Sequence, residues 1–498
     1  MDIIEPHRIP HSAPTIPSSA YIDSVAMAAA VAIGGAVSIA YAERIGINAG
    51  QGWDGISYTQ WAQNIAKTLH DGLTRYHAQR ILPSAVVSLF SKHDVPHVLT
   101  AFAIMNVAVC TGAAFLWGDL ARFMKWSRPA AWAGFVGLFC SFAIAKHAVY
   151  YPALTDPTAF ALGMGMIWAY MRDRPVVLTG IALASMLTWP ALTPLALIML
   201  IVPAVRRVEF TVHAEPSTRT KISATALAIV AAATFIITGL HYLAHPLTGV
   251  GDEKFAQWVL RPWLVLTLPL LSATIVLGLY YVISPVSRPV QSVRSVNRHR
   301  LYASMAAAVA LFIARSFYLA QFGTRGEGPT GAQFLCEHTL AALRGPLWGI
   351  VAHFVYFGPV VAVVIVVWKR IGQVAWSWGP AASLGLMFIV MFAAGSNSRQ
   401  WSHLVPLLVA LCIAATNAWW TRGRVFWFAM IALIWSKVWL HLGYDSVLDW
   451  HEFPNQRYFM NTGPYSADRP YVVHFVAAAI TLLITNLASR FCRVGAHE

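Results

Sequence analysis

The hydrophobic residues of this chain recur in long blocks rather than in the short alternating pattern of β-strands. Most blocks are about 15 to 23 residues long, enough for a helix rising 1.5 Å per residue to cross a hydrocarbon layer of ~30 Å. A membrane β-barrel would instead show alternating segments of ~10 residues. The pattern predicts an all-α integral membrane protein. We expect about fourteen transmembrane helices. They lie near 21–42, 98–118, 129–149, 157–171, 176–189, 191–205, 222–244, 263–284, 302–321, 347–368, 380–395, 403–420, 425–441 and 471–488.

The composition supports this class. Hydrophobic residues make up 57% of the chain and charged residues only 11%, whereas soluble proteins carry roughly 25% charged residues. The net charge of +14 does not indicate a nucleic-acid partner, because the basic residues lie in short loops between apolar blocks. Five cysteines do not form a disulfide framework. The first helix ends in Ala40-Tyr41-Ala42, which mimics a signal-peptidase site, but its apolar stretch is longer than the apolar region of an ordinary signal peptide and predicts an uncleaved anchor.

Lys and Arg concentrate in alternate loops, and the acidic residues follow the opposite trend. By the positive-inside rule this places both termini in the cytoplasm. The chain contains no Gly/Ser linker and no internal repeat, so we expect a single polytopic membrane domain over 1–498 in the bacterial inner membrane. A long first periplasmic loop over 43–97 and a late one over 442–470 stand out.

The first loop carries the most informative motif, Gly52-Trp53-Asp54-Gly55-Ile56-Ser57-Tyr58. Trp61, Ile65 and Leu69 then repeat with helical spacing, which predicts an amphipathic helix in the membrane interface. Asp54 stands between two glycines that allow a ligand to approach the backbone; the alternative is a helix N-cap. Further candidates in this loop are Tyr58, Arg75, His77 and Arg80. The two arginines either bind a ligand or extend to lipid head groups.

Other polar residues are expected on the same side of the membrane. A short turn contains Lys146, His147, Tyr151 and Asp156, and Asp156 before Pro157 either caps the next helix or serves a ligand. Lys146 lies near a membrane boundary, where cations tend to be paired or functional. The remaining polar positions are Arg315, Arg399 and His403, and in the late loop Asp445, Asp449, Trp450, His451, Glu452, Gln456, Arg457 and Tyr458.

Together these residues suit glycosyl transfer from a phosphate-linked donor. A carboxylate can take the proton of an acceptor hydroxyl, while Arg and Lys stabilise the departing phosphate. Aromatic and polar side chains can hold a sugar.

In architecture and motifs the chain resembles the GT-C glycosyltransferases, multi-helix enzymes that use polyprenyl-phosphate sugars. Gly52–Tyr58 is similar to their bacterial G-x-D-G-x-x-Y pattern, and Tyr76–Pro83 is similar to the Tyr-Arg-x-x-Arg-Ile-Leu run that often follows. His77 stands where that run commonly has Arg. We expect no soluble C-terminal domain, and in this respect the chain is similar to the helix-only dolichol-linked glucosyltransferases and mannosyltransferases.

The resemblance implies Asp54 as the catalytic base and inversion at the anomeric carbon. It assigns the donor phosphate to Arg80, Arg399, Lys146 and Arg75. For the substrates it implies Asp156, His147, Tyr58, His77, Tyr151 and His403. A lone Asp156 replaces the usual acidic pair of the second loop, so a divalent metal is not favoured and no cofactor is assigned. The partners implied are a polyprenyl-phosphate sugar, a glycan, glycolipid or protein acceptor in the cell envelope, and membrane lipids.

Two other functions stay open on the sequence. A lipid or sugar transporter or flippase would suit the many helices and the Pro-broken pair at Trp189-Pro190, although acidic residues are missing from the helix interiors. A polysaccharide polymerase or ligase is chemically close, but such enzymes rely on long late loops, and here the longest loop is the first.

Overall fold

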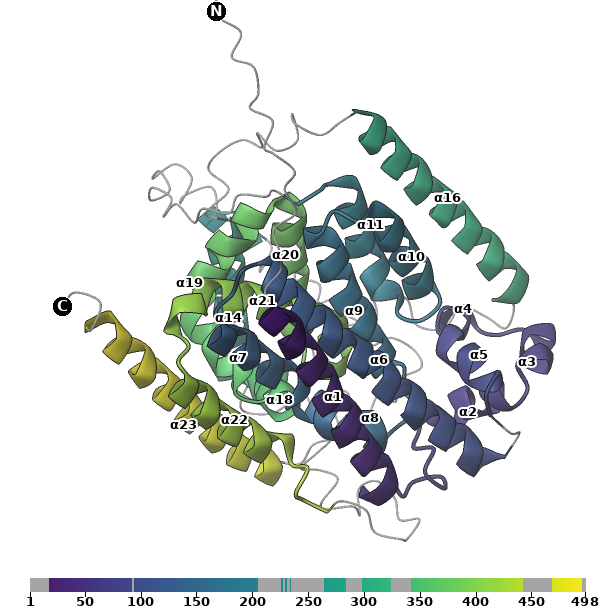
Figure 1. The fold of residues 1–498 in the computed structure, drawn as a ribbon, viewed down its shortest axis with the longest axis horizontal. Coiled ribbons are helices and arrows are strands. Elements are labelled where there is room, and N and C mark those ends of the chain that lie inside the picture. Colours follow the sequence, from purple (N-terminus) through teal and green to yellow (C-terminus); the bar gives the residue numbers. More distant parts are fainter. Residues whose placement is uncertain are drawn as a thin grey trace, which may run out of the picture.

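The computed structural model describes residues 18–91, 94–204, 264–283, 298–323, 342–441 and 468–494, with isolated positions between 225 and 233. In this part of the chain every regular element is a helix (Figure 1). Seven of the described helices are long and apolar enough to cross a membrane, and a bent pair makes an eighth if it is one span. These helices indicate a multi-pass membrane protein. The count of about fourteen and the orientation of the termini stay predictions.

Most expected helices are present with similar bounds. They are α1 (Ser18–Tyr41), α6 (Val95–Phe123), α9 (Asp156–Met171), α14 (Leu264–Ile283), α16 (Arg298–Phe322), α20 (Pro380–Ala393), α21 (Val405–Thr416), α22 (Arg422–Ser436) and α23 (Asp468–Val494). The expected helix at 222–244 lies largely outside the described residues, as does nearly all of the late loop 442–470.

Three expected continuous helices are broken. The helix expected at 347–368 is divided into α18 (Trp348–Phe357) and the start of α19 (Val360–Trp378). The break lies at Gly358, which has a φ of 72° and is followed by Pro359. The helix expected at 129–149 is α7 (Arg128–Phe139), the π-helical turn η1 (Phe142–Lys146) and α8 (His147–Tyr150), with a bend of 60°.

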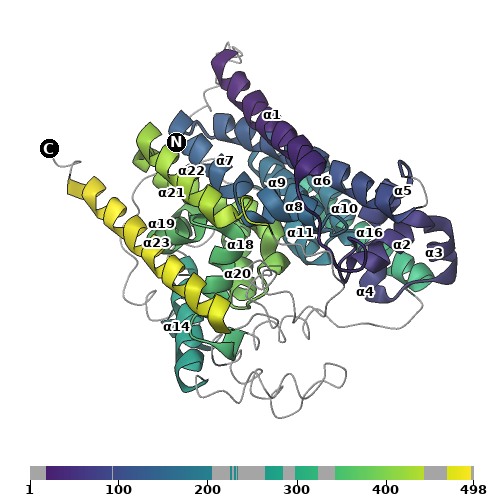
Figure 2. The same cartoon turned by 90° about the horizontal axis from the view of Figure 1, so that it is seen from below.

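The third break lies in the first loop. The expected amphipathic helix divides at Asn64, whose extended backbone ends α2 (Gly55–Gln63) and whose side chain accepts a hydrogen bond from Lys67 N to begin α3 (Ile65–Asp71). Two more short helices follow, α4 (Arg75–Ala78) and α5 (Leu82–Ser88). In Figures 1 and 2, α2 to α5 gather beside the first turns of α6.

The pair at Trp189-Pro190 is broken as expected. It consists of α10 (Pro175–Met186), a 3-10 turn η2 (Pro190–Leu192) and α11 (Thr193–Ile201). Trp189 is extended, with φ −149° and ψ 84°, the conformation favoured before proline. Because α10 has 12 residues and is thus ~18 Å long, it is too short to cross ~30 Å of hydrocarbon alone. α10 and α11 pack against each other across the turn, so the pair forms a short hairpin and not one long broken helix.

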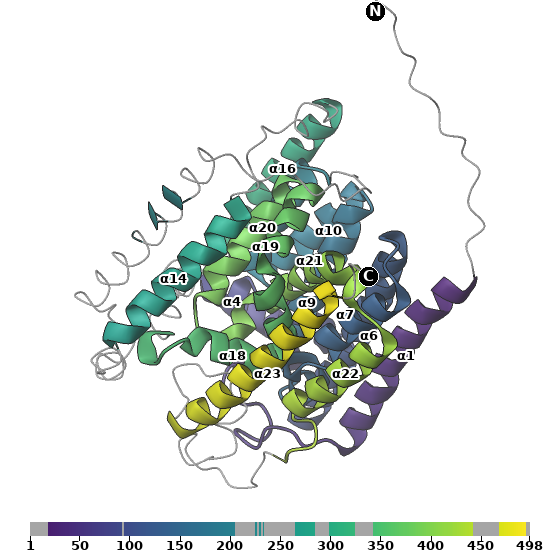
Figure 3. The same ribbon diagram turned by 90° about the vertical axis from the view of Figure 1, so that its left-hand side faces the viewer.

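The buried core lies where α9 packs against α6, α10 and α21, with α19 on the far side of α21. The helices α1, α16 and α23 lie at the rim (Figures 1 and 3), and most of their surface is not buried by the protein, as expected for helices facing lipid. α23 is joined to α22 by a hydrogen bond from Trp435 Nε1 to Thr481 Oγ1 of 3.3 Å.

The two ends of α9 carry different chemistry. At its C-terminal end Asp119 of α6 accepts hydrogen bonds from Arg122, Arg172 and Trp168, which ties the two helices together. At its N-terminal end Asp156 pairs with Arg399 of η5 (Ser398–Leu404), and the same guanidinium lies 3.9 Å from Asp54 of the first loop. The packing of α9 against α6 thus brings polar segments that are distant in sequence to one end of the bundle.

Candidate active site

A tight backbone turn presents Asp54. Gly50 and Gly52 have φ of 88° and 64°, and Asn48, also left-handed, donates from Nδ2 to Gly52 O over 2.7 Å. A side chain at Gly52 would also collide with Tyr151, whose Cζ lies 2.3 Å from the position of a Cβ. The glycine is required by backbone conformation and by space.

Asp54 occupies the N-cap position of α2, but its side chain makes no capping hydrogen bond. Its carboxylate is 57% exposed. The capping interpretation of Asp54 is therefore wrong. The carboxylate instead lies at the surface at this end of the bundle, 3.9 Å from the guanidinium of Arg399.

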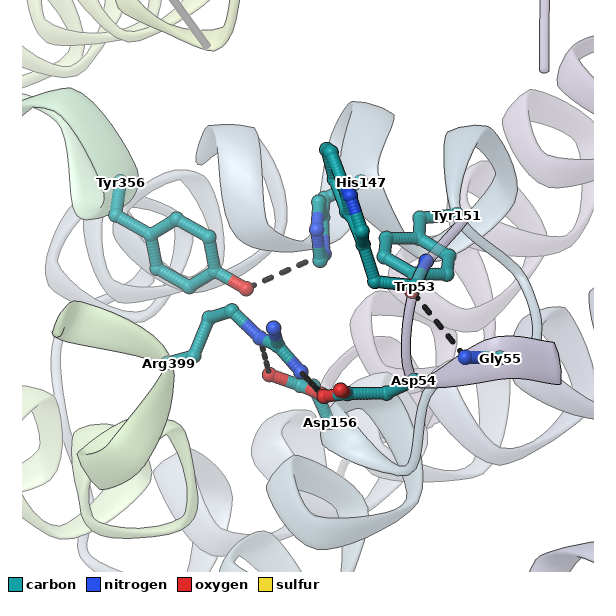
Figure 4. A network of polar contacts seen from close by, with 8 residues as sticks. All are labelled: Trp53, Asp54, Gly55, His147, Tyr151, Asp156, Tyr356 and Arg399. Atoms are coloured by element: carbon teal, nitrogen blue, oxygen red, sulfur yellow. Dashed lines mark hydrogen bonds and ion pairs between the residues drawn. The ribbon is translucent and has the colours of Figure 1, made fainter. Parts of the chain in front are cut away.

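Arg399 joins the first loop to the start of α9 (Figure 4). Its Nε donates to Asp156 Oδ1 over 2.9 Å and its Nη2 to Asp156 Oδ2 over 3.2 Å, a bidentate pair with a nearly fully buried carboxylate. The same Nη2 lies 3.9 Å from Asp54 Oδ2. Asp156 anchors the guanidinium, so the alternative that it only caps α9 is wrong as well.

Two tyrosines and a histidine line the other side of the cluster. Tyr356 of α18 is buried, and its hydroxyl lies 3.2 Å from His147 Nδ1. The His147 ring also packs edge-on against Tyr151, with centroids 6.0 Å apart. The Tyr151 hydroxyl accepts hydrogen bonds from the backbone N–H groups of Trp53, at 2.7 Å, and Gly55, at 3.2 Å (Figure 4).

Arg80 provides a second buried cation near this group. Its guanidinium stacks between the rings of Tyr76 and Trp189, 4.5 and 4.6 Å from their centroids. Burial raises the pKa of the nearby Tyr58 hydroxyl to about 12, although the charge of Arg80 acts in the opposite direction. Tyr58 therefore stays protonated at neutral pH. The Nε of Arg80 is buried and makes no hydrogen bond with the described residues.

The other predicted site residues are dispersed. Arg75 is exposed at the start of α4. His77 packs against Trp61, with ring centroids 5.0 Å apart. Its pKa is lowered mainly by burial and further by the charge of Arg80. Lys146 donates to Glu43 over 2.9 Å. His403 is fully buried, and its ring nitrogens make no hydrogen bond with described residues. The structure thus groups Asp54, Asp156, Arg399, His147 and Tyr151, while the ammonium of Lys146 is engaged by Glu43.

A cavity of about 10 Å³ lies beneath the cluster, lined in part by Ser141, Asp156, Tyr356 and Ser402. Such a space holds about one water molecule. This cavity is therefore too small for a ligand larger than a water molecule.

Sequence reasoning missed two residues of α18 that support the site. His353 Nδ1 lies 2.8 Å from Ser398 Oγ and its Nε2 lies 2.8 Å from Ala393 O, so one ring holds both ends of the turn before Arg399. Tyr356, three residues later, is on the same helix face. The signal was a polar pair spaced by three residues in an apolar segment, which is weak without the fold.

Within the described ranges no group of three His, Cys, Asp or Glu side chains is placed to hold a metal ion. The chain matches no protein-family model, no curated protein and no solved structure with which it was compared.

Proposed function

We propose that this protein is a membrane glycosyltransferase of the GT-C type, which moves a sugar from a polyprenyl phosphate to an envelope acceptor on the periplasmic face of the inner membrane. The observation that carries the proposal is the arrangement of Asp54 and Arg399. An exposed carboxylate lies 3.9 Å from a guanidinium that a buried carboxylate holds in place. A base and a cation for a leaving phosphate therefore lie side by side before substrate binds.

In the proposed reaction Asp54 accepts the proton of the acceptor hydroxyl while that oxygen forms a bond to the anomeric carbon. The bond between this carbon and the phosphate oxygen breaks, and its electron pair leaves with the phosphate. A single displacement of this kind inverts the anomeric configuration. Asp54 is suited to the first step because its carboxylate is exposed and makes no capping hydrogen bond.

The leaving phosphate would be received by the two arginines. A guanidinium has five N–H donors, and Arg399 uses Nε and one Nη2 hydrogen on Asp156, so three donors are not used by Asp156. Arg80 adds a cation whose Nε makes no hydrogen bond among the described residues. In this proposal Asp156 is a positioning residue for Arg399, because both of its oxygens accept from that guanidinium.

The lipid part of the donor suits the surroundings of the site. The bundle carries rim helices whose apolar faces are not covered by protein, so a polyprenyl chain can stay in the bilayer while its head group reaches the loops. The small cavity below Asp156 also favours a substrate that enters from outside rather than one enclosed by the bundle.

The test is Asp54→Asn, with Asp94→Asn as a matched control in the same loop. Asp94 is an exposed carboxylate that caps α6 by accepting from His97 N over 3.1 Å, and asparagine caps equally well. Each variant is expressed in cells that lack the native gene, and envelope glycans and glycolipids are profiled by mass spectrometry. We expect Asp54→Asn to lose nearly all product at normal membrane abundance, because an amide cannot accept the proton, and Asp94→Asn to keep it.

Binding of a long-chain polyprenyl phosphate, measured by native mass spectrometry, separates chemistry from recognition. Asp54→Asn should bind this lipid as the wild type does, whereas Arg399→Gln should bind it at least tenfold more weakly. Full glycan output from Asp54→Asn would refute the proposed function. Transport of lipid across liposomes by purified protein without any acceptor, unaffected by Asp54→Asn, would instead favour the transporter.

A further inference from the structure

The hydroxyl of Tyr151 makes a contact that substrate binding does not account for. It lies inside the turn that bears Asp54 and accepts two backbone hydrogen bonds, from Trp53 N at 2.7 Å and Gly55 N at 3.2 Å. These are the two residues that flank Asp54. A phenol oxygen has two acceptor lone pairs, so both are engaged by the first loop.

Several features show that the turn is built around this tyrosine. Tyr151 is buried, with 4% of its surface exposed. Gly52 and Gly55 approach its ring so closely that a Cβ at either position would lie 2.3 or 3.0 Å from a ring atom. The Trp53 ring packs edge-on against it, with centroids 6.4 Å apart.

Tyr151 also belongs to the segment that supplies the other site residues. It directly follows α8, which begins at His147, and it precedes α9, which begins at Asp156. Two hydrogen bonds to one oxygen fix the backbone N–H groups of Trp53 and Gly55, one on each side of Asp54, relative to that segment. The backbone of Asp54 is thereby held at a set distance from Asp156 and from the Arg399 guanidinium bound to it (Figure 4).

We propose that Tyr151 is a positioning residue, which clamps the Asp54 turn onto the second loop and so sets where the catalytic carboxylate points. In this proposal Tyr151 acts through the backbone of Asp54 and not through the substrate contact that the family resemblance implies. It rests on the proposed function for the role of Asp54, but the clamp itself is a property of the backbone that is measured separately.

The test compares Tyr151→Phe with Tyr150→Phe. The two tyrosines are adjacent in sequence and both are buried, and each change removes one hydroxyl. The Tyr150 hydroxyl, however, has no hydrogen-bond partner among the described residues. Tyr151→Phe keeps the ring that packs against Gly52, so the expected effect is confined to the two hydrogen bonds. Hydrogen–deuterium exchange in detergent micelles, thermal unfolding and cellular glycan output are measured for both variants.

In Tyr151→Phe we expect exchange of the amides at residues 53–55 to rise about ten- to a hundredfold, because two N–H groups lose their acceptor. Exchange in α6 should stay unchanged, and the unfolding temperature should fall by only a few degrees, because the loss is confined to two hydrogen bonds of the first loop. Turnover should fall about a hundredfold, as for other small misplacements of a catalytic group. Tyr150→Phe should match the wild type in all three measurements.

Unchanged exchange at 53–55 in Tyr151→Phe would overturn the clamp, whatever the protein's function. Faster exchange with full glycan output, in a protein that Asp54→Asn inactivates, would overturn the positioning role while leaving the proposed function intact. If Asp54→Asn itself retains output, the proposed function fails and with it the need to position this carboxylate.

Discussion

The buried ion pair between Asp156 and Arg399 allows a quantitative prediction. Asp156 is 4% exposed and both of its oxygens accept from Arg399, at 2.9 and 3.2 Å. At an effective dielectric constant of ~20, unit charges ~4 Å apart attract by about 4 kcal/mol. Removing one member of a buried pair costs about 3–5 kcal/mol, and without Asp156 the Arg399 guanidinium would keep only Asp54, 3.9 Å away, as an acidic neighbour among the described residues. The two estimates agree.

We therefore expect Asp156→Ala to lower the free energy of unfolding by about 4 kcal/mol. The assay is reversible unfolding in mixed micelles. Arg399→Met alone should cost a similar amount, whereas the double variant Asp156→Leu with Arg399→Met should recover most of the loss, since apolar replacement of a whole buried pair is often neutral. Glycan output should stay absent in the double variant, because the cation for the phosphate is missing.

The reasoning would be refuted by a cost of no more than ~1 kcal/mol for Asp156→Ala, the value typical of an exposed pair. Additive losses in the double variant would also contradict it, since residues in direct contact are expected to couple. Stability restored together with glycan output would show that Arg399 is structural only.

Three further predictions follow from the first loop. Gly52→Ala should lower glycan output at least tenfold, because alanine is strained at φ 64° and its Cβ would collide with Tyr151; output equal to that of the wild type would contradict this. Arg80→Lys should weaken polyprenyl-phosphate binding in native mass spectrometry, since an ammonium keeps the charge but loses the planar stacking on Trp189. Burial, and to a smaller extent the charge of Arg80, lowers the pKa of His77 in the folded state. As the pH falls below ~6.5, the His77 ring therefore binds a proton in the unfolded chain before it does so in the folded one, and the stability of the protein decreases. His77→Gln should flatten this decline between about pH 7 and 5 in thermal unfolding, and an unchanged slope would refute it.

The membrane class and most helix positions followed from sequence because the controlling quantity is local. A helix must carry enough consecutive apolar residues to cross the bilayer, and this is visible without a partner. The break at Trp189-Pro190 was also visible, since proline restricts its own backbone and that of its neighbour.

Sequence also singled out Asp54, Asp156 and Arg399 as polar residues in loops between apolar helices. It left open whether the two aspartates were helix caps, because an N-cap and a ligand-binding carboxylate have the same local pattern. The structure decided between them through one distant side chain. Arg399 lies 243 residues from Asp156 in sequence, yet it donates hydrogen bonds to both oxygens of the Asp156 carboxylate.

The roles of Tyr151, Tyr356 and Lys146 depended on tertiary structure alone. Nothing local distinguishes Tyr151, which clamps the Asp54 turn, from Tyr150, whose hydroxyl has no hydrogen bond among described residues. Likewise only packing assigns Lys146 to Glu43, 103 residues away in sequence. The length of an apolar stretch is a property of one segment, whereas the position of a charge is set by every segment that packs around it. The sequence by itself therefore determined which stretches can lie in the membrane. The tertiary structure decided which polar groups contact each other.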